Sequence, residues 1–213
     1  MENEMMFESR KDAETLVGGL SHPSKMPCSG YSIPASSCKM GAMMSKNPNS
    51  ICAKCYAKKG MYRFGNVKRA LQRRLESLSN PRWVAAMTFL IKDMKYFRWH
   101  DSGDVQDMTH FLKIVEVARN TPKTTHWLPT REYGLVSEYV KTYGSFPENL
   151  IVRLSASKFN GVAPVALAES LGVLVSGASA TDYNCVAPKQ DNACGDCRKC
   201  WDKNVFQVNY KKH

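Results

Sequence analysis

Eight cysteines are the side chains of this 213-residue sequence with the clearest chemical potential. They fall into two sets of four: Cys28, Cys38, Cys52 and Cys55, and Cys185, Cys194, Cys197 and Cys200. Each set contains a C-x2-C pair, which presents two thiolates from one tight turn. Buried structural thiols belong in apolar, periodic segments, whereas these cysteines lie among glycines and prolines. We therefore interpret both sets as metal ligands.

The spacing leaves the identity of the metal open. Cys194, Cys197 and Cys200 make two consecutive C-x2-C steps, as in the iron–sulfur runs of ferredoxins. A tetrahedral zinc ion could instead use Cys185 or His213 as the fourth ligand. Zinc in a structural site is our first expectation, and a [4Fe–4S] cluster is the alternative.

A second group of reactive side chains follows the predicted strand 96–100. A carboxylate held at a strand end can act as a nucleophile or a general base, so we predict Asp101 and Asp104 to be catalytic. Capping of the helix that follows would explain one of these acids without any catalysis. Neighbouring polar and small residues are predicted to bind substrate: Ser102, Gly103 and Gln106.

Polar residues also follow the later strands. Arg131 suits phosphate or base-edge recognition, and Glu132 adjoins it, although a surface ion pair is an equal alternative. The next two strand ends contribute three further predicted substrate-binding residues: Ser155, Ser176 and Gly177.

The elements that must position these residues alternate along the second half of the chain. Hydrophobic patterns predict strands over 96–100, 125–129, 150–155, 173–176 and 205–208, and helices over 66–78, 81–94, 108–120, 133–143 and 162–171. Such alternation predicts parallel βαβ units, and ligands of such sheets bind at the carboxyl ends of the strands. We expect an α/β fold with a compact or partial TIM-barrel-like parallel sheet and cysteine-rich metal-binding loops.

Four segments make up the predicted organisation. They are an N-terminal lead (1–20), a basic Cys-rich segment (21–65), an α/β core (66–184) and a C-terminal Cys-rich metal-binding segment (185–213).

The formal net charge of +11 is concentrated between Glu14 and Glu76, where eleven Lys or Arg occur and no acid does. Such a block favours a polyanionic partner, and aromatic residues among the charges favour nucleic acid, with DNA as first choice. A solvated basic face without a partner is the alternative. The acidic, polar N-terminus and the lack of a long apolar run predict a cytoplasmic protein that does not engage a membrane.

Two short motifs resemble one enzyme family. Asp101-Ser102-Gly103-Asp104-Val105-Gln106 and Leu128-Pro129-Thr130-Arg131 resemble segments of tRNA-guanine transglycosylases and their phage DNA relatives. This resemblance implies a TIM barrel with a cysteine-bound zinc, and exchange of guanine for a 7-deazaguanine through a covalent glycosyl-aspartate. Asp101 would then be the active-site acid, and Gln106 a base-binding group.

A second resemblance covers most of the chain. The run from Cys52 to Tyr62, the His-Asp-Ser-Gly-Asp turn and the C-terminal CxxCxxCW are similar to a family of small, uncharacterised phage proteins. The C-x2-C-Tyr-Ala element also resembles phage proteins thought to be iron–sulfur and radical-S-adenosylmethionine-like. That resemblance implies three cysteines around a [4Fe–4S] cluster that cleaves S-adenosylmethionine, inside a partial α/β barrel.

Three functions are compatible with these features. The first hypothesis is a phage nucleic-acid-modifying enzyme of the base-exchange type, acting on DNA in the infected cell. The second is an iron–sulfur enzyme that uses S-adenosylmethionine, and the third is a non-enzymatic zinc protein that binds nucleic acid.

Overall fold

Six parallel strands form one sheet in the order β1-β2-β3-β4-β5-β6. The computed structural model describes residue 7 and residues 9–212. The strands are β1 (Gly30–Tyr31), β2 (Tyr96–Trp99), β3 (Thr125–Thr130), β4 (Leu150–Ser155), β5 (Leu174–Ser179) and β6 (Gln207–Lys211).

Seven α-helices are found in the described residues. They are α1 (Arg10–Val17), α2 (Lys39–Met44), α3 (Gly65–Ser77), α4 (Trp83–Ile91), α5 (Met108–Asn120), α6 (Tyr133–Tyr143) and α7 (Val165–Ser170). Short 3-10 turns lie at Ala35–Ser37, Cys52–Lys54, Tyr56–Lys58, Gly60–Arg63, Ala187–Lys189 and Lys199–Trp201.

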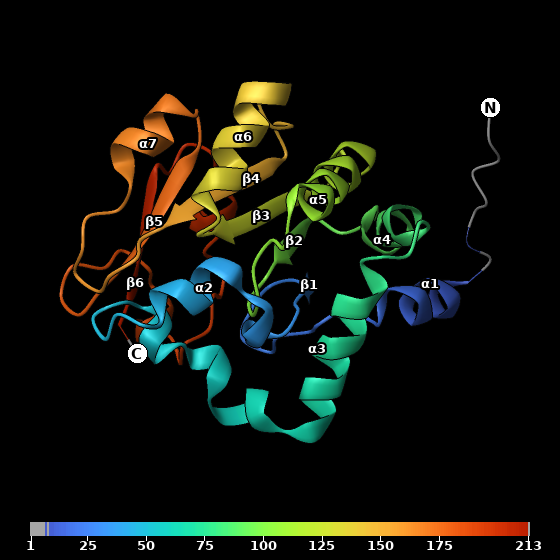
Figure 1. The fold of residues 1–213 in the computed structure, drawn as a ribbon, viewed down its shortest axis with the longest axis horizontal. Helices are drawn as coiled ribbons and strands as arrows, with labels where there is room; N and C mark the ends of the chain where they lie inside the picture. The colour runs from blue at the N-terminus through green and yellow to red at the C-terminus, as the bar shows by residue number, and fades with distance from the viewer. Residues whose placement is uncertain (1–6, 8, 213) are drawn as a thin grey trace.

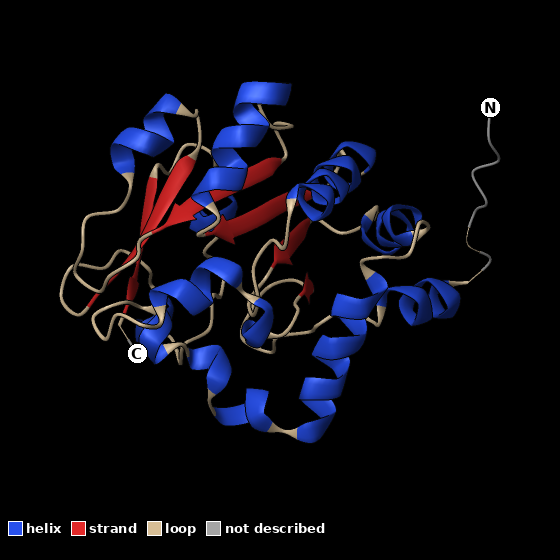
Figure 2. Ribbon diagram, viewed as in Figure 1, coloured by secondary structure: helices blue, strands red, loops and turns tan. Residues whose placement is uncertain are grey.

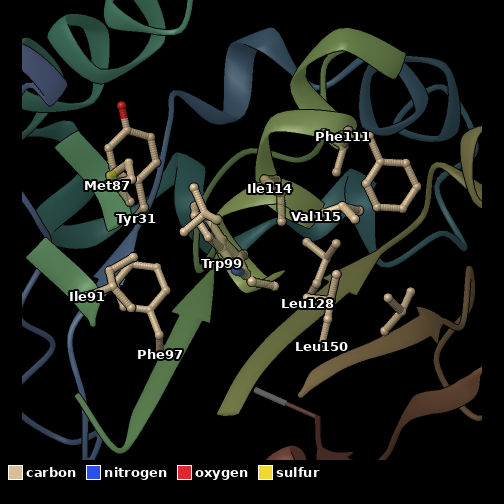
Figure 3. Packing of buried hydrophobic residues seen from close by; sticks show 14 of the residues in the cluster. Tyr31, Met87, Ile91, Phe97, Trp99, Phe111, Ile114, Val115, Leu128 and Leu150 are labelled. Atoms are coloured by element: carbon tan, nitrogen blue, oxygen red, sulfur yellow. The ribbon is translucent and has the colours of Figure 1, made fainter. Parts of the chain in front are cut away.

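The sequential strand order determines where the helices lie. Crossovers between neighbouring parallel strands are right-handed, so α5, α6 and α7 all pack on the same face of the sheet (Figures 1 and 2). Alternate side chains of each strand point to that face. In Figure 3, Trp99 of β2 and Leu128 of β3 lie next to Ile114 of α5, and Phe97 of β2 lies beside Ile91 of α4; all five are fully buried.

The N-terminal helix α1 belongs to this core. The Ser9 hydroxyl caps the helix by accepting from the Asp12 amide, and Gly18 ends it in a left-handed conformation. Ala13 and Val17 are fully buried in the core, so the predicted N-terminal lead contains a packed helix.

The opposite face of the sheet is covered by the segment between β5 and β6. Trp201 donates a hydrogen bond from Nε1 to the carbonyl of Phe97 at 2.9 Å, and its ring meets the ring of Trp127 with centroids 5.1 Å apart. The C-terminal Cys-rich segment therefore packs against the sheet and also supplies its last strand, β6.

Arg153 of β4 anchors that covering segment. Its side chain is fully buried, and its guanidinium donates five hydrogen bonds to backbone carbonyls. The accepting carbonyls belong to Val175, Lys199, Cys200, Asp202 and Phe206, at 2.9–3.3 Å. Four of the five lie between β5 and β6, so one side chain fixes the path of this long connection.

The α/β class and the all-parallel sheet are confirmed. The structure places α5, α6 and β4 over the same residues as predicted, and it adds β1 and α2, which the sequence analysis did not predict. Closure into a barrel is not confirmed, because the strand pairings in the described chain run from β1 to β6 without joining those two. In the part that the structure describes, no helix is long and apolar enough to cross a membrane.

Three buried histidines should make stability depend on pH. Burial lowers the pKa of His126 to about 3; burial and then the charge of Lys113 lower the pKa of His110 to about 3. Burial also lowers the pKa of His100 well below its ordinary value. Below pH 6.5 the unfolded chain therefore binds more protons than the folded chain. The free energy of unfolding should decrease as the pH is lowered, by up to about 1.4 kcal/mol per pH unit for each histidine.

Urea unfolding between pH 5 and 7 measures this dependence. His126→Phe keeps an aromatic ring stacked on Trp99 and removes one titrating group, so below pH 6 its slope should be smaller by up to about 1.4 kcal/mol per pH unit. His22→Asn, at an exposed histidine, is the control and should keep the wild-type slope. An unchanged slope in His126→Phe would contradict the prediction.

Arg153→Lys should destabilise the fold. A lysine cannot donate to five carbonyls at once, so several buried carbonyls lose their partner, and we expect a loss of about 3 kcal/mol or more. Lys203→Gln, at an exposed ion pair with Glu148, should change stability by less than about 0.5 kcal/mol. Chemical denaturation of both variants compares these losses, and similar values would refute the anchoring role.

Candidate functional site

The loops that follow β1 and β2 are joined at the carboxyl edge of the sheet. Ile33 donates its amide to the carbonyl of Ser102 at 3.1 Å, and the Ser102 hydroxyl donates to the carbonyl of Ile33 at 3.0 Å. Gly103 has a φ of +81°, and a Cβ there would lie 2.3 Å from Cγ1 of Ile33. Ser102 and Gly103, predicted to bind substrate, thus hold two loops together.

Asp104 joins the same turn to the end of β3. Its carboxylate accepts from the Thr130 hydroxyl at 2.7 Å, the Arg131 amide at 2.9 Å and the Val105 amide at 2.8 Å. Burial raises its pKa to about 6, and these hydrogen bonds oppose that rise. Gln106 donates its side-chain amide to the Asp104 carbonyl at 2.6 Å. The geometry gives Asp104 and Gln106 a structural part in this turn.

Asp101 has a different environment. Its Oδ2 accepts from the Tyr62 hydroxyl at 2.7 Å, and its backbone carbonyl accepts from the Tyr56 hydroxyl. Its Oδ1 is buried and has no hydrogen-bond partner among the described residues. Of the two predicted catalytic acids, Asp101 therefore keeps an oxygen that could accept from a substrate.

Arg98 of β2 lies near this carboxylate, and the sequence analysis missed it. Burial alone would lower its pKa, but the neighbouring Tyr56 and Asp101 raise it above the ordinary value. Its Nη1 donates to Sδ of Met26 at 3.1 Å, and its guanidinium lies 4.5 Å from the centre of the Trp127 ring. A lone arginine in a short apolar strand gives no local signal of such a role.

Three cysteines gather in the loop after β1. A Cβ at Gly41 would lie 2.8 Å from Cβ of Cys38, and the sulfurs of Cys38 and Cys52 lie 3.7 and 3.9 Å from that same position. Burial, together with the charges of Asp104, Cys55 and Cys52, raises the pKa of Cys38 to about 12. Cys38, Cys52 and Cys55 therefore form one group of interacting thiols, which we call the loop thiols.

Two predicted substrate-binding residues, Arg131 and Glu132, lie near the loop thiols. Burial raises the pKa of Cys52, and the Arg131 guanidinium opposes that rise. Arg131 also donates from Nε to the carbonyl of Ala156 at 3.1 Å. Glu132 accepts the Met40 amide at 3.0 Å and so fixes the first turn of α2 beside Cys38. Arg131 and Glu132 thus bring the end of β3 against this group.

The other cysteines lie on a different part of the sheet. Burial raises the pKa of Cys28 to about 12, and its charged neighbours include Cys194 and Cys200. The Cys194 amide donates to the Lys25 carbonyl at 2.9 Å, which brings the two segments together. Cys28 thus interacts with the C-terminal set, and we call these five residues the sheet thiols: Cys28, Cys185, Cys194, Cys197 and Cys200.

The sequence predicted two groups of four cysteines, whereas the structure has one group of three and one of five. All eight cysteines are free thiols. Within the described residues, no three His, Cys, Asp or Glu side chains already converge as metal ligands, so the metal-binding loops are not confirmed. His213, the other suggested zinc ligand, lies outside the described residues.

The remaining predicted residues lie on β4 and β5. The Ser155 and Ser176 hydroxyls are hydrogen-bonded at 3.1 Å on one face of the sheet. Gly177 is the next residue along β5, so it faces the other way, where a Cβ would lie 2.4 Å from Oδ1 of Asn209. The structure therefore brings Ser155 and Ser176 together and separates Gly177 from them.

A family model described as Gene product 88 matches residues 5–203. The chain belongs to the Gene product 88 family. This assignment fits the resemblance to small phage proteins and gives no support to the transglycosylase resemblance. No match was found among curated proteins or among solved structures.

Proposed function

We propose that this member of the Gene product 88 family is an iron–sulfur enzyme, with a [4Fe–4S] cluster held by Cys38, Cys52 and Cys55. The observation that carries the proposal is the grouping of the loop thiols apart from the other five, in the loop after the first strand of a parallel sheet. Ligands of parallel sheets bind at this edge.

The three loop thiols are suitable ligands for an iron–sulfur cluster. Thiolates are the ligands of iron–sulfur clusters, and three of them leave one iron without a protein ligand. Burial raises the pKa of Cys52, as it does that of Cys38, and Cys55 raises both further. A bound cationic metal would reverse that repulsion, because metal ligation deprotonates thiols. A structural zinc ion, our first expectation, takes four ligands, and the loop thiols supply three.

The open iron supports S-adenosylmethionine as the second cofactor. Such a cluster, once reduced by an external one-electron donor, would supply the electron that breaks a carbon–sulfur bond of S-adenosylmethionine, which yields methionine and a 5′-deoxyadenosyl radical. The chain's own residues would position the reactants: Glu132 fixes the loop that carries Cys38, and Arg131 places positive charge beside Cys52. The buried Oδ1 of Asp101 would accept a hydrogen bond from the molecule that reacts.

A second candidate function rests on the same carboxylate. In a base exchange, Asp101 would attack the anomeric carbon of a nucleotide in DNA, and the departing base would leave with the bonding electrons. The free Oδ1 favours this candidate, whereas Asp104 is already committed to three donors. The basic segment supports DNA as the substrate of either enzyme.

Cysteine substitutions and metal analysis test the first proposal. Protein purified without oxygen should be brown, contain about four iron and four sulfide per chain, and cleave S-adenosylmethionine after reduction. Cys38→Ser, Cys52→Ser and Cys55→Ser should each abolish that cleavage. Cys197→Ser, among the sheet thiols, is the matched control and should retain it. A colourless protein with zinc and no iron would overturn the proposal.

Asp101→Asn separates the two candidate functions. A base-exchange enzyme should lose incorporation of labelled guanine into DNA by a factor of at least about 1,000, because an amide is a poor nucleophile. An iron–sulfur enzyme should keep its iron content and visible spectrum in the same variant. Tyr62→Phe, which removes the donor to Oδ2 and leaves the carboxylate, controls for disturbance of the turn.

A further inference from the structure

A basic cleft of about 260 Å³ is lined in part by Lys54, a residue of the loop that carries the loop thiols. The lining residues are Pro48, Asn49, Lys54, Lys158, Phe159, Asn160 and Lys212. Three of them are lysines, and none of the described lining residues is acidic. Lys54 stands in the chain between Cys52 and Cys55, which places this cleft next to the proposed cluster.

Loops from three strand ends build the cleft. Ile51 donates its amide to the carbonyl of Ser157 at 2.9 Å, which joins the Cys-rich segment to the loop after β4. Asn160 donates its amide to Ala178 of β5 at 2.9 Å. The Lys212 amide donates to the carbonyl of Ser179 at 2.8 Å, so the chain after β6 closes the third side.

The three ammonium groups are not neutralised within the described chain. The ion pairs found there join Arg10 to Glu14 and Lys203 to Glu148, and neither involves the cleft. The ammonium of Lys212 lies 5.1 Å from the centre of the Phe159 ring. Like charges gathered in a concave surface repel one another and attract an anion.

We propose that this cleft is a phosphate-binding site, which holds a phosphate group of the substrate beside Cys52 and Cys55. Lysine ammonium groups bind phosphate as point charges, and Asn49 and Asn160 add side-chain amides to the lining. The placement beside the cluster rests on the proposed function. A nucleic acid strand and a free nucleotide carry the same phosphate chemistry, so the test must include both.

The molecule offers a matched control. A second cleft of about 280 Å³ is lined by Lys92, Asp93, Met94, Lys95 and Lys123. It precedes β2 and β3, so it lies at the amino edge of the sheet, opposite the loop thiols. Replacing its three lysines removes the same charge from the other end of the molecule.

The experiment measures binding of a single-stranded DNA oligonucleotide, a nucleoside monophosphate and inorganic phosphate to full-length protein. The triple variant Lys54→Gln/Lys158→Gln/Lys212→Gln should bind the preferred probe at least about tenfold more weakly at low salt. If that probe is the oligonucleotide, the slope of log affinity against log salt should shrink by about 2. Lys92→Gln/Lys95→Gln/Lys123→Gln should lose less than about twofold.

Each outcome decides the question. If the first triple variant loses affinity mainly for the oligonucleotide, the source of the phosphate is a nucleic acid strand. If it loses affinity for the nucleoside monophosphate to the same extent, the source is a small phosphorylated molecule. Equal losses in both triple variants, or wild-type binding by the first, would overturn the proposal. Iron content measured on the same samples reports the proposed function separately, so failure of one inference is distinguishable from failure of the other.

Discussion

A buried arginine that, within the described residues, donates only to backbone carbonyls shapes one whole face of this protein. Arg153 satisfies its guanidinium with five backbone carbonyls, and four of these belong to the connection between β5 and β6. An unpaired buried cation is costly, so the connection must pass where its carbonyls can reach the guanidinium. That path carries Cys200 and Trp201 against the sheet and brings the C-terminal cysteines toward Cys28.

At the carboxyl edge of the sheet, buried polar side chains also fix the path of the chain, here by joining neighbouring loops. Ser102 joins the loops after β1 and β2, Asp104 joins the second loop to β3, and Glu132 returns from β3 to α2. Together with the chain from Ile33 to Met40, these hydrogen bonds close a ring that contains Cys38. A loop that carries reactive groups but lacks regular structure must be held by hydrogen bonds to rigid elements. Polar residues at the strand ends can serve that purpose without touching a substrate.

Periodic segments were predictable from the sequence, and contact-dependent features were not. Helix α5 and strand β4 have strong apolar patterns, so their limits follow from local sequence. Strand β1 has two residues, Gly30 and Tyr31, and it is a strand because it pairs with β2. The association of Cys28 with the sheet thiols also depends on contacts across the fold, beginning with the bond from Cys194 to Lys25. The spacing of cysteines along the chain does not predict such contacts.

Charge distinguishes the two groups of thiols. Cys38 faces Asp104 and Glu132, which oppose thiolate formation, while Arg131 favours it at Cys52. Among the sheet thiols, Arg98 lowers the pKa of Cys28, Cys194 and Cys200 against the effect of burial. Arg98 and Arg153 are cations on the covered face of the sheet, so both would stabilise thiolates there. Cys38 instead faces two carboxylates, so a cationic metal would stabilise its thiolate most.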